Sequence, residues 1–382
     1  MMIKLKIILK KIILIGIKAV QKLVDNISND ENIYLVSRAI TPDQRQDIQV
    51  RLNFYVPGRA LKTHSHLSLV VALGSQPVLT FGEFGPISKR YRIYRGGFFN
   101  IDHNNNYVAG WAWCNLAEYC TKEKADISDS SHRFNIYINA LRKQHLDKTY
   151  IFGTGPSLPK AMEKDWSDGY RIVCNTIVRD PDLWHKINPH FIVAGDAIYH
   201  FSDTEFARAF RRDLFLRMSE TNTYFVFPAM FNSIVMREMP DYADRLIPIP
   251  DGIHTKITVD LCQDFSLPST GNVLTFLLLP LGCTLSKAVF LWGFDGRAPT
   301  DQLFWANSAK HSYPEFLPQL QENFPAFFDR LVPKDNPSHY AQKVHGKILE
   351  ELLQVAENEG WHFVMMHPSW TPVLQKRFIQ EG

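Results

Sequence analysis

The sequence predicts an α/β fold in which a Rossmann-like, mainly parallel sheet has helices on both faces. A small β-rich domain and an N-terminal amphipathic helix are expected to precede this sheet. Three observations support the prediction. From about residue 148 onward, short apolar runs alternate with longer helical patterns, which is the arrangement that gives a parallel sheet. Before that point, residues 33–115 contain short β-branched and aromatic runs between turn-forming residues. The first residues interleave isoleucine and leucine with lysine.

The alternating part of the chain contains candidate strands separated by candidate helices. The strands are expected at 150–153, 171–175, 191–195, 224–227, 288–292 and 361–365. The clearest helices are expected at 203–218, 270–282 and 338–358. Open parallel sheets bind ligands outside the carboxyl ends of their strands. The binding site is therefore expected in the loops that follow these strands.

The length and composition indicate a folded protein with more than one domain. A length of 382 residues favours two domains, or one large domain with an appendage. The residue patterns indicate a basic amphipathic helix at 1–31, a β-rich accessory domain at 32–125 and an α/β nucleotide-binding catalytic domain at 126–382. Hydrophobic residues make up 45% and charged residues 21%, which excludes a wholly disordered chain. The five cysteines form no Cys-x-x-Cys pair, so neither a disulfide framework nor a zinc ribbon is indicated. A reducing cytoplasm fits this cysteine usage best.

Residues 1–24 hold six lysines and no acidic residue. The rest of the chain has 36 basic against 39 acidic residues, so it has no overall positive field that would attract nucleic acid. The longest apolar run, 12–17, is far shorter than the roughly 20 residues that span a bilayer. A lysine-rich helix with a broad apolar face suits an anionic membrane surface. We therefore expect a cytoplasmic protein held peripherally on the inner face of the membrane. Docking of this helix on the protein's own body or on a partner is the alternative.

Residues 33–115 indicate a small antiparallel β domain, with candidate strands at 67–73, 78–81 and 91–94. His64 and His66 would point to the same side of a strand. Such a pair is compatible with metal binding, but no third ligand lies nearby in the sequence. A structural role for both histidines is the alternative.

The strongest local signal is the segment YIFGTGPSL at 150–158, a short apolar strand that runs into a glycine-bracketed turn and a helix start. Gly153 and Gly155 allow close approach of the backbone to a ligand, and the helix start that follows presents free N–H groups that suit an anion. Thr154 and Ser157 are the other candidate binding residues of this turn. The segment is neither a G-x-G-x-x-G fingerprint nor a P-loop. It predicts the phosphate end of a nucleotide site, with a tight strand–helix connection as the alternative.

Other predicted strands also end in polar residues. Asn175, Asp196 and Asp295 each follow such a strand. Asparagine suits a base or a ribose because its amide both donates and accepts, and aspartate accepts from ribose hydroxyls. Thr270 and Gly271, in a Ser-Thr-Gly segment, are expected to cap the next helix and to meet a ligand there. Capping alone is the alternative for all of these residues.

A Ser-His-Tyr segment opens the helix expected at 338–358 and contains His339 and Tyr340, while His345 follows in the same helix. A histidine of near-neutral pKa suits a general base, and a tyrosine can hydrogen-bond a phosphate oxygen. On one helix, His339 and His345 face sides roughly 120° apart. The two histidines therefore cannot readily serve the same hydroxyl.

The order of these pieces resembles that of the bacterial sialyltransferases that use CMP-sialic acid. The resemblance covers residues 148–367 and rests on G-T-G-P-S-L after a strand, then C-N, S-T-G before a helix, G-F-D after a strand, and S-H-Y. The glycine turn alone is also similar to that of the 6-hydroxymethylpterin diphosphokinase-like family. The chain departs from the sialyltransferase pattern at Thr154, at 195–196, at Arg297 after G-F-D, and at Lys343, which stands where that family has its base.

The resemblance to the sialyltransferases implies that the glycine turn and Asn175 bind CMP, that Thr270 helps to hold the cytidine, and that Tyr340 binds the phosphate. It also implies that no metal and no cofactor beyond the CMP-sugar donor are needed. We therefore expect an inverting glycosyltransferase that moves sialic acid or a related ulosonic acid to a glycan or glycolipid acceptor in surface polysaccharide synthesis. His345, or alternatively His339, would remove the proton of the acceptor hydroxyl. Tyr340, with Arg297 or Lys310, would offset charge on the leaving phosphate.

Two other classes of function remain open on the sequence. One is a Mg²⁺-dependent diphosphokinase of the pterin type, in which Asp196 and Asp295 would hold the metal. The other is a non-catalytic glycan-binding scaffold. Release of CMP in the presence of a chelator would favour the transferase, and Mg²⁺-dependent release of AMP would favour the kinase.

Overall fold

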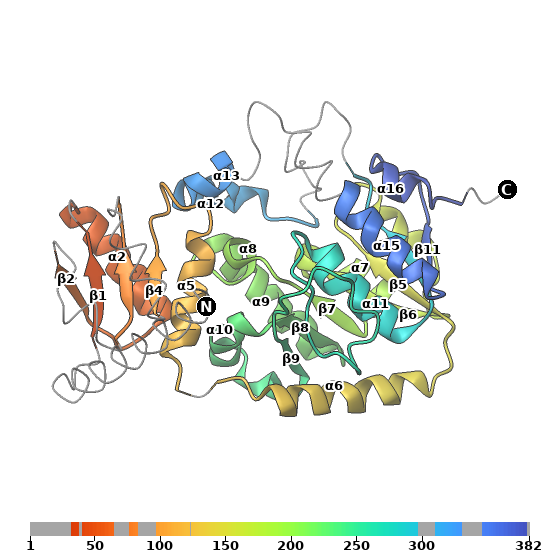
Figure 1. Cartoon of the computed structure of the whole chain (residues 1–382). Coiled ribbons are helices and arrows are strands. Elements are labelled where there is room, and N and C mark those ends of the chain that lie inside the picture. The colour runs from red at the N-terminus through yellow and green to blue at the C-terminus, as the bar shows by residue number, and fades with distance from the viewer. Residues whose placement is uncertain are drawn as a thin grey trace, which may run out of the picture. The chain divides into compact units, whose positions relative to one another are not determined.

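The computed structural model describes residues 32–37, 40–64, 76–82, 97–122, 124–296, 310–330 and 346–379 (Figure 1). The chain divides into two compact units. The first contains Met1–Lys122 together with Phe324–Phe327, and the second contains Glu123–Asn323 together with Phe328–Gly382. The lysine-rich segment 1–24 lies outside the described residues.

The first unit contains a four-stranded sheet, and its strands run parallel. The order is β2-β1-β3-β4, with every pairing parallel. The strands are β1 (Ile33–Val36), β2 (Leu61–His64), β3 (Val78–Thr80) and β4 (Phe98–Asn100). The expected antiparallel arrangement was therefore wrong. The expected strands at 67–73 and 91–94, His66 and the side chain of His64 lie outside the described residues.

A helix that the sequence analysis did not predict explains the parallel pairing. Helix α2 (Pro42–Tyr55) carries the chain from β1 back to the start of β2, and parallel neighbours require such a crossover. It begins with a capping box in which Thr41 and Gln44 exchange hydrogen bonds. Only four of its 14 side chains are buried, and one of them is Arg51; the others are Ile48, Leu52 and Tyr55, so the apolar periodic signal is weak. Helix α5 (Ala109–Cys120) follows β4, and Trp113 on it stacks on Tyr55 at 5.2 Å between ring centroids.

The second unit contains a seven-stranded sheet in the order β11-β10-β5-β6-β7-β8-β9, with every pairing parallel. The strands are β5 (Lys148–Phe152), β6 (Tyr170–Cys174), β7 (Phe191–Val193), β8 (Tyr224–Pro228), β9 (Leu246–Ile249), β10 (Ala288–Trp292) and β11 (His362–Met365). The predicted parallel α/β sheet is therefore confirmed. Strand β9 was not among the predicted strands, because its Leu-Ile-Pro-Ile run contains a proline. It lies at the edge of the sheet, where proline is tolerated.

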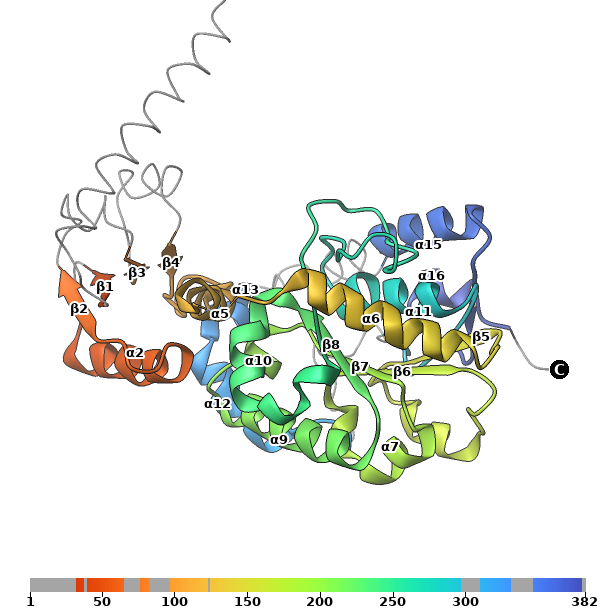
Figure 2. The same cartoon turned by 90° about the horizontal axis from the view of Figure 1, so that it is seen from below.

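Helices cover both faces of this sheet (Figure 2). One face carries α6 (Ile127–Arg142), α11 (Leu279–Leu285) and α15 (Leu349–Asn358), whose apolar side chains share one buried core with the strands. The other face carries α7 (Pro181–Ile187) and α9 (Glu205–Glu220). The remaining helices are short: α8 (Ala197–His200), α10 (Asn232–Glu238), α12 (Leu317–Asn323), α13 (Pro325–Arg330) and α16 (Pro372–Gln375). Single turns occur at Leu158–Glu163, Asn175–Arg179, Ala229–Phe231, Pro240–Arg245 and Pro314–Phe316, and the π-helical turn Leu274–Leu278 leads into α11.

The chain order fixes where the sheet changes direction. From β5 the chain builds β6 to β9 on one side, then returns to place β10 and β11 on the other side of β5. The switch point therefore lies between β5 and β10. Ligands of open α/β sheets bind in the crevice outside the carboxyl ends of the strands at such a point. Across the described residues, no helix is both long enough and apolar enough to cross a membrane.

Candidate functional site

The glycine turn lies at this switch point, tightly packed against the loop that follows β10. Gly153 N donates to Trp292 O at 2.7 Å, and Gly155 N donates to Gly293 O at 2.8 Å. A Cβ atom built on Gly153 would lie 2.6 Å from Gly293 O, and one built on Gly155 would lie 2.1 Å from Asp295 Oδ2. Glycine is thus needed at both positions so that a neighbouring loop of the same chain can approach.

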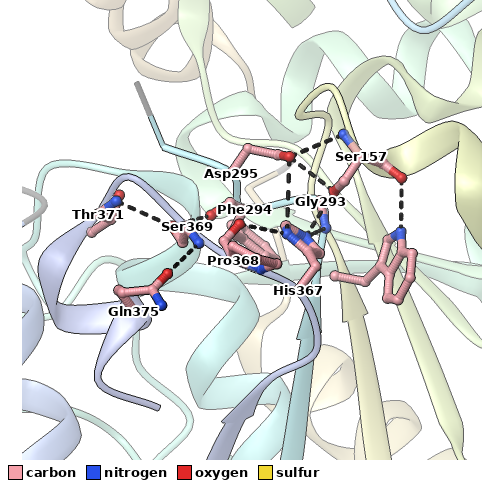
Figure 3. Close-up of polar contacts among 10 residues, drawn as sticks. Ser157, Gly293, Phe294, Asp295, His367, Pro368, Ser369, Thr371 and Gln375 are labelled. Atoms are coloured by element: carbon pink, nitrogen blue, oxygen red, sulfur yellow. Dashed lines mark hydrogen bonds and ion pairs between the residues drawn. The ribbon is translucent and has the colours of Figure 1, made fainter. Parts of the chain in front are cut away.

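The carboxylate of Asp295 accepts hydrogen bonds from the backbone amide of Ser157. Ser157 N donates to both carboxylate oxygens, at 3.1 and 3.2 Å, and Ser157 Oγ donates to Oδ2 at 3.0 Å (Figure 3). A carboxylate of the protein therefore takes the position that the sequence analysis assigned to a ligand anion. The structure brings Gly153, Gly155, Ser157 and Asp295 together at one edge of the sheet, as predicted. However, the backbone N–H groups of Gly153, Gly155 and Ser157 already donate hydrogen bonds within the chain.

His367, which was not among the predicted site residues, completes this cluster. Its Nε2 atom accepts from Gly293 N at 2.9 Å and lies 2.7 Å from Ser157 Oγ (Figure 3). Because Nε2 accepts a backbone N–H, the ring proton belongs on Nδ1, which lies 2.9 Å from Pro368 O. The signal that was available is the segment His-Pro-Ser directly after the last predicted strand, at the same edge of the sheet.

This cluster differs from a catalytic Ser-His-Asp triad. In a triad, the carboxylate bonds Nδ1 and the serine donates to a free Nε2. Here the Nδ1 of His367 is 3.9 Å from Asp295 Oδ1 and bonds a carbonyl instead, while Ser157 bonds the carboxylate directly. The arrangement joins the ends of β5, β10 and β11 and gives no activated serine.

Asn175, at the end of β6, has a strained backbone and an unsatisfied side chain. Its φ of 52° lies in the left-handed region, which asparagine tolerates better than most residues. Its Oδ1 atom is buried and, among the described residues, accepts no hydrogen bond. The next residue is fixed, because Thr176 Oγ1 donates to His311 O at 2.5 Å. An unsatisfied buried acceptor costs free energy, which a ligand donor would recover.

Thr270 and Asn272 present two more such atoms before the helix that leads into α11. Asn272 caps this helix, because its Oδ1 accepts from Thr275 N at 3.1 Å. The prediction that the Ser-Thr-Gly segment, which includes Thr270 and Gly271, caps this helix was therefore wrong, because the cap is the residue that follows it. In the described part of the chain, Thr270 Oγ1 and Asn272 Nδ2 are buried without a partner. Asn272 was not among the predicted site residues.

Contacts place the start of this helix at the carboxyl edge. A Cβ atom on Gly195, just after β7, would lie 2.2 Å from the ring of Phe276. Just beyond the other end of the helix, Ser286 Oγ lies 2.8 Å from Oγ1 of Thr149, near the amino end of β5. The helix thus runs antiparallel to the strands and begins near the end of β7. Asn175, which follows β6, and residues 270–272, which precede this helix, therefore both lie on the carboxyl side of the sheet.

Asp196 also follows β7, and its carboxylate is engaged within the chain. Its Oδ1 accepts from Ile198 N at 2.9 Å and from Tyr199 N at 3.2 Å, which caps α8. Burial raises the pKa of Asp196 to about 6, although the two N–H donors act in the opposite direction. The Nδ1 of His200 accepts from Asp196 N at 3.2 Å, and burial lowers the pKa of His200 to about 3, so this histidine stays neutral.

The expected catalytic residues His339, Tyr340 and His345 lie outside the described residues, as does Arg297. Lys310 is described and is exposed. Within the described ranges, no group of three or more His, Cys, Asp or Glu side chains is arranged to hold a metal ion. Comparison of the chain with protein-family models, curated proteins and solved structures gave no match.

Proposed function

We propose that the protein is an inverting glycosyltransferase that moves an acidic sugar, sialic acid or a related ulosonic acid, from CMP to a glycan acceptor. The observation that carries the proposal is the set of unsatisfied buried atoms at the carboxyl edge: Asn175 Oδ1, Thr270 Oγ1 and Asn272 Nδ2. They comprise an acceptor, a hydroxyl and a donor. Cytosine offers an amino donor beside ring nitrogen and carbonyl acceptors, so its edge complements this set.

The strand order supports the placement of the nucleotide. The base would lie beyond β6 and β7, and the phosphate would lie toward the switch point between β5 and β10. Because the Asp295 carboxylate already accepts from Ser157 N, the phosphate is expected away from that amide, near the half-buried Thr154. A phosphate bound at the Ser157 amide would lie beside the Asp295 carboxylate, and the two negative charges would repel each other.

In the proposed reaction, the acceptor hydroxyl oxygen forms a bond to the anomeric carbon as the bond from that carbon to the CMP phosphate breaks. The hydroxyl proton passes to His345, or to His339 in the alternative assignment. Tyr340, with Arg297 or Lys310, offsets the charge that develops on CMP. A lysine-rich segment at 1–24 would hold the enzyme on the inner membrane face, near a lipid-linked acceptor.

The competing diphosphokinase would use Asp196 and Asp295 as metal ligands. Each carboxylate accepts backbone N–H groups of its own chain, and the two residues follow β7 and β10, which are separated by β5 and β6. No described contact favours this alternative over the transferase. It remains an outcome of the experiment below, as does a non-catalytic scaffold.

The test is calorimetric binding of CMP, UDP, GDP and ATP to the full chain and to three variants. Asn272→Asp keeps the capping oxygen and removes the donor, Thr270→Val removes the hydroxyl, and Asn175→Gly removes the amide at a position whose φ glycine accepts. We expect CMP to bind best, and each variant to weaken CMP by about 1 to 3 kcal/mol.

The matched control is Asn188→Gly. Asn188 has a φ of 48°, close to that of Asn175, but it precedes β7 and so lies at the opposite edge of the sheet. This variant should leave CMP affinity unchanged. Preference for ATP with Mg²⁺ would support the kinase, and a chain that binds none of the four nucleotides would contradict both enzymes.

A further inference from the structure

Trp370 presents a large aromatic surface to solvent at the same edge of the sheet. It follows β11, and 64% of it is exposed. Within the described part of the chain, its indole nitrogen makes no hydrogen bond. Aromatic side chains dominate the energetics of cores and interfaces, and one left in water beside a site is available to a ligand. The ring offers an apolar face and a free N–H donor.

The backbone beneath the indole is fixed to the loop after β10. Trp370 N donates to Asp295 O at 2.6 Å, and Ser369 Oγ donates to Phe294 O at 2.7 Å. Ser369 Oγ also accepts from Thr371 N at 3.1 Å, and Ser369 N donates to Gln375 Oε1 at 2.7 Å (Figure 3). A ring on a rigid backbone loses little conformational entropy when a ligand packs on it.

The strand order gives the position of Trp370 along the site. Its loop follows β11, which is separated from β6 by β10 and β5. Neighbouring strands lie about 4.8 Å apart, so the three steps from β6 to β11 correspond to about 14 Å. A nucleotide sugar whose base lies at Asn175 would pass the switch point with its phosphate. Its sugar would then reach the loop that carries Trp370.

We propose, on the basis of the proposed function, that Trp370 is a stacking platform for the pyranose ring of the donor sugar. One face of a pyranose carries C–H groups, which pack against the negative face of an aromatic ring. The hydroxyls at the rim of the sugar can accept from the indole N–H. The loop at 367–371 thus forms the sugar end of the site, and the unsatisfied amide and hydroxyl groups form its base end.

The test compares two ligands on the full chain, CMP and the non-transferable analogue CMP-3-fluoro-sialic acid, by calorimetry. Trp370→Ala should weaken the sugar nucleotide about tenfold, equivalent to about 1.4 kcal/mol, and CMP less than about twofold. Trp370→Phe retains a ring and should recover part of the loss. Phe215→Ala, which removes another exposed aromatic, on α9, should change neither affinity.

Equal weakening of both ligands in Trp370→Ala, or no weakening of the sugar nucleotide, would overturn the platform while leaving the proposed function intact. The same holds if the wild-type chain binds CMP and its sugar nucleotide equally well. If the wild-type chain binds neither ligand, the proposed function itself fails and the platform falls with it.

Discussion

His367 Nε2 accepts the backbone N–H of Gly293 at 2.9 Å, and this contact joins the last strand of the sheet to the loop beside the glycine turn. Gly293 is buried, with a φ of 79°. The N–H of a buried residue requires an acceptor. The imidazole supplies it from the edge of the sheet and also contacts Ser157 Oγ.

The first prediction concerns this acceptor. His367→Ala leaves the Gly293 N–H without its partner and should lower the free energy of unfolding by about 1 to 3 kcal/mol. His367→Gln places a carbonyl oxygen near the position of Nε2 and should recover most of the loss. His367→Asn, whose oxygen corresponds to Nδ1, should not. Urea unfolding measures all three, and a glutamine variant as unstable as the alanine variant would rule out the acceptor role.

The second prediction is a pH dependence of stability that arises from Asp196. Its pKa is raised from 3.8 to about 6, so between these values the folded state binds more protons than the unfolded state. The contribution of Asp196 to the free energy of unfolding therefore falls as pH rises from about 4 to about 6. At pH 7 the buried charge of Asp196 lowers the free energy of unfolding by at most about 3 kcal/mol.

Asp196→Asn keeps an oxygen that can accept from Ile198 N and Tyr199 N but carries no charge. The stability of this variant relative to wild type should therefore increase between pH 4 and pH 7. Denaturant unfolding at both pH values measures the change. Parallel pH profiles for the two proteins would show that burial of Asp196 does not shift its pKa.

The third prediction concerns the general base. If His345 is the base, His345→Ala should lower turnover by roughly 10² to 10⁴ while CMP affinity stays nearly constant, because proton transfer acts in the transition state. His339→Ala is the paired variant and should retain turnover. The reverse pattern would assign the base to His339, and near-normal turnover in both would leave the proposed mechanism without a base.

The fourth prediction concerns the lysine-rich segment. The full chain should sediment with anionic phospholipid vesicles at low salt, and less so as salt screens the lysines. Replacement of Lys4, Lys6, Lys10, Lys11, Lys18 and Lys22 by glutamine should abolish sedimentation without changing CMP affinity. If the wild-type chain does not sediment with such vesicles, the segment binds a protein partner or docks on the chain itself.

The sequence alone determined the elements whose signal is local. The strands β5, β6, β7, β8, β10 and β11 lie within a few residues of their expected positions, because short apolar runs bounded by turns can be recognised from neighbouring residues. The alternation with helices also predicted the parallel sheet correctly. The edge at which Asn175, Asp196 and Asp295 lie followed from the same pattern, since parallel strands end on one side.

Only the tertiary structure decided how distant segments pair. The parallel pairing of the strands in the first sheet depends on the crossover helix α2. The capping box of this helix can be recognised in the sequence, but its apolar pattern is weak. The partner of Ser157 N is Asp295, 138 residues away, and His367 is 210 residues from Ser157. Neither spacing nor composition encodes such contacts. Which amides of the glycine turn are already bonded, and which buried polar atoms are left for a ligand, is fixed when the loops pack against one another.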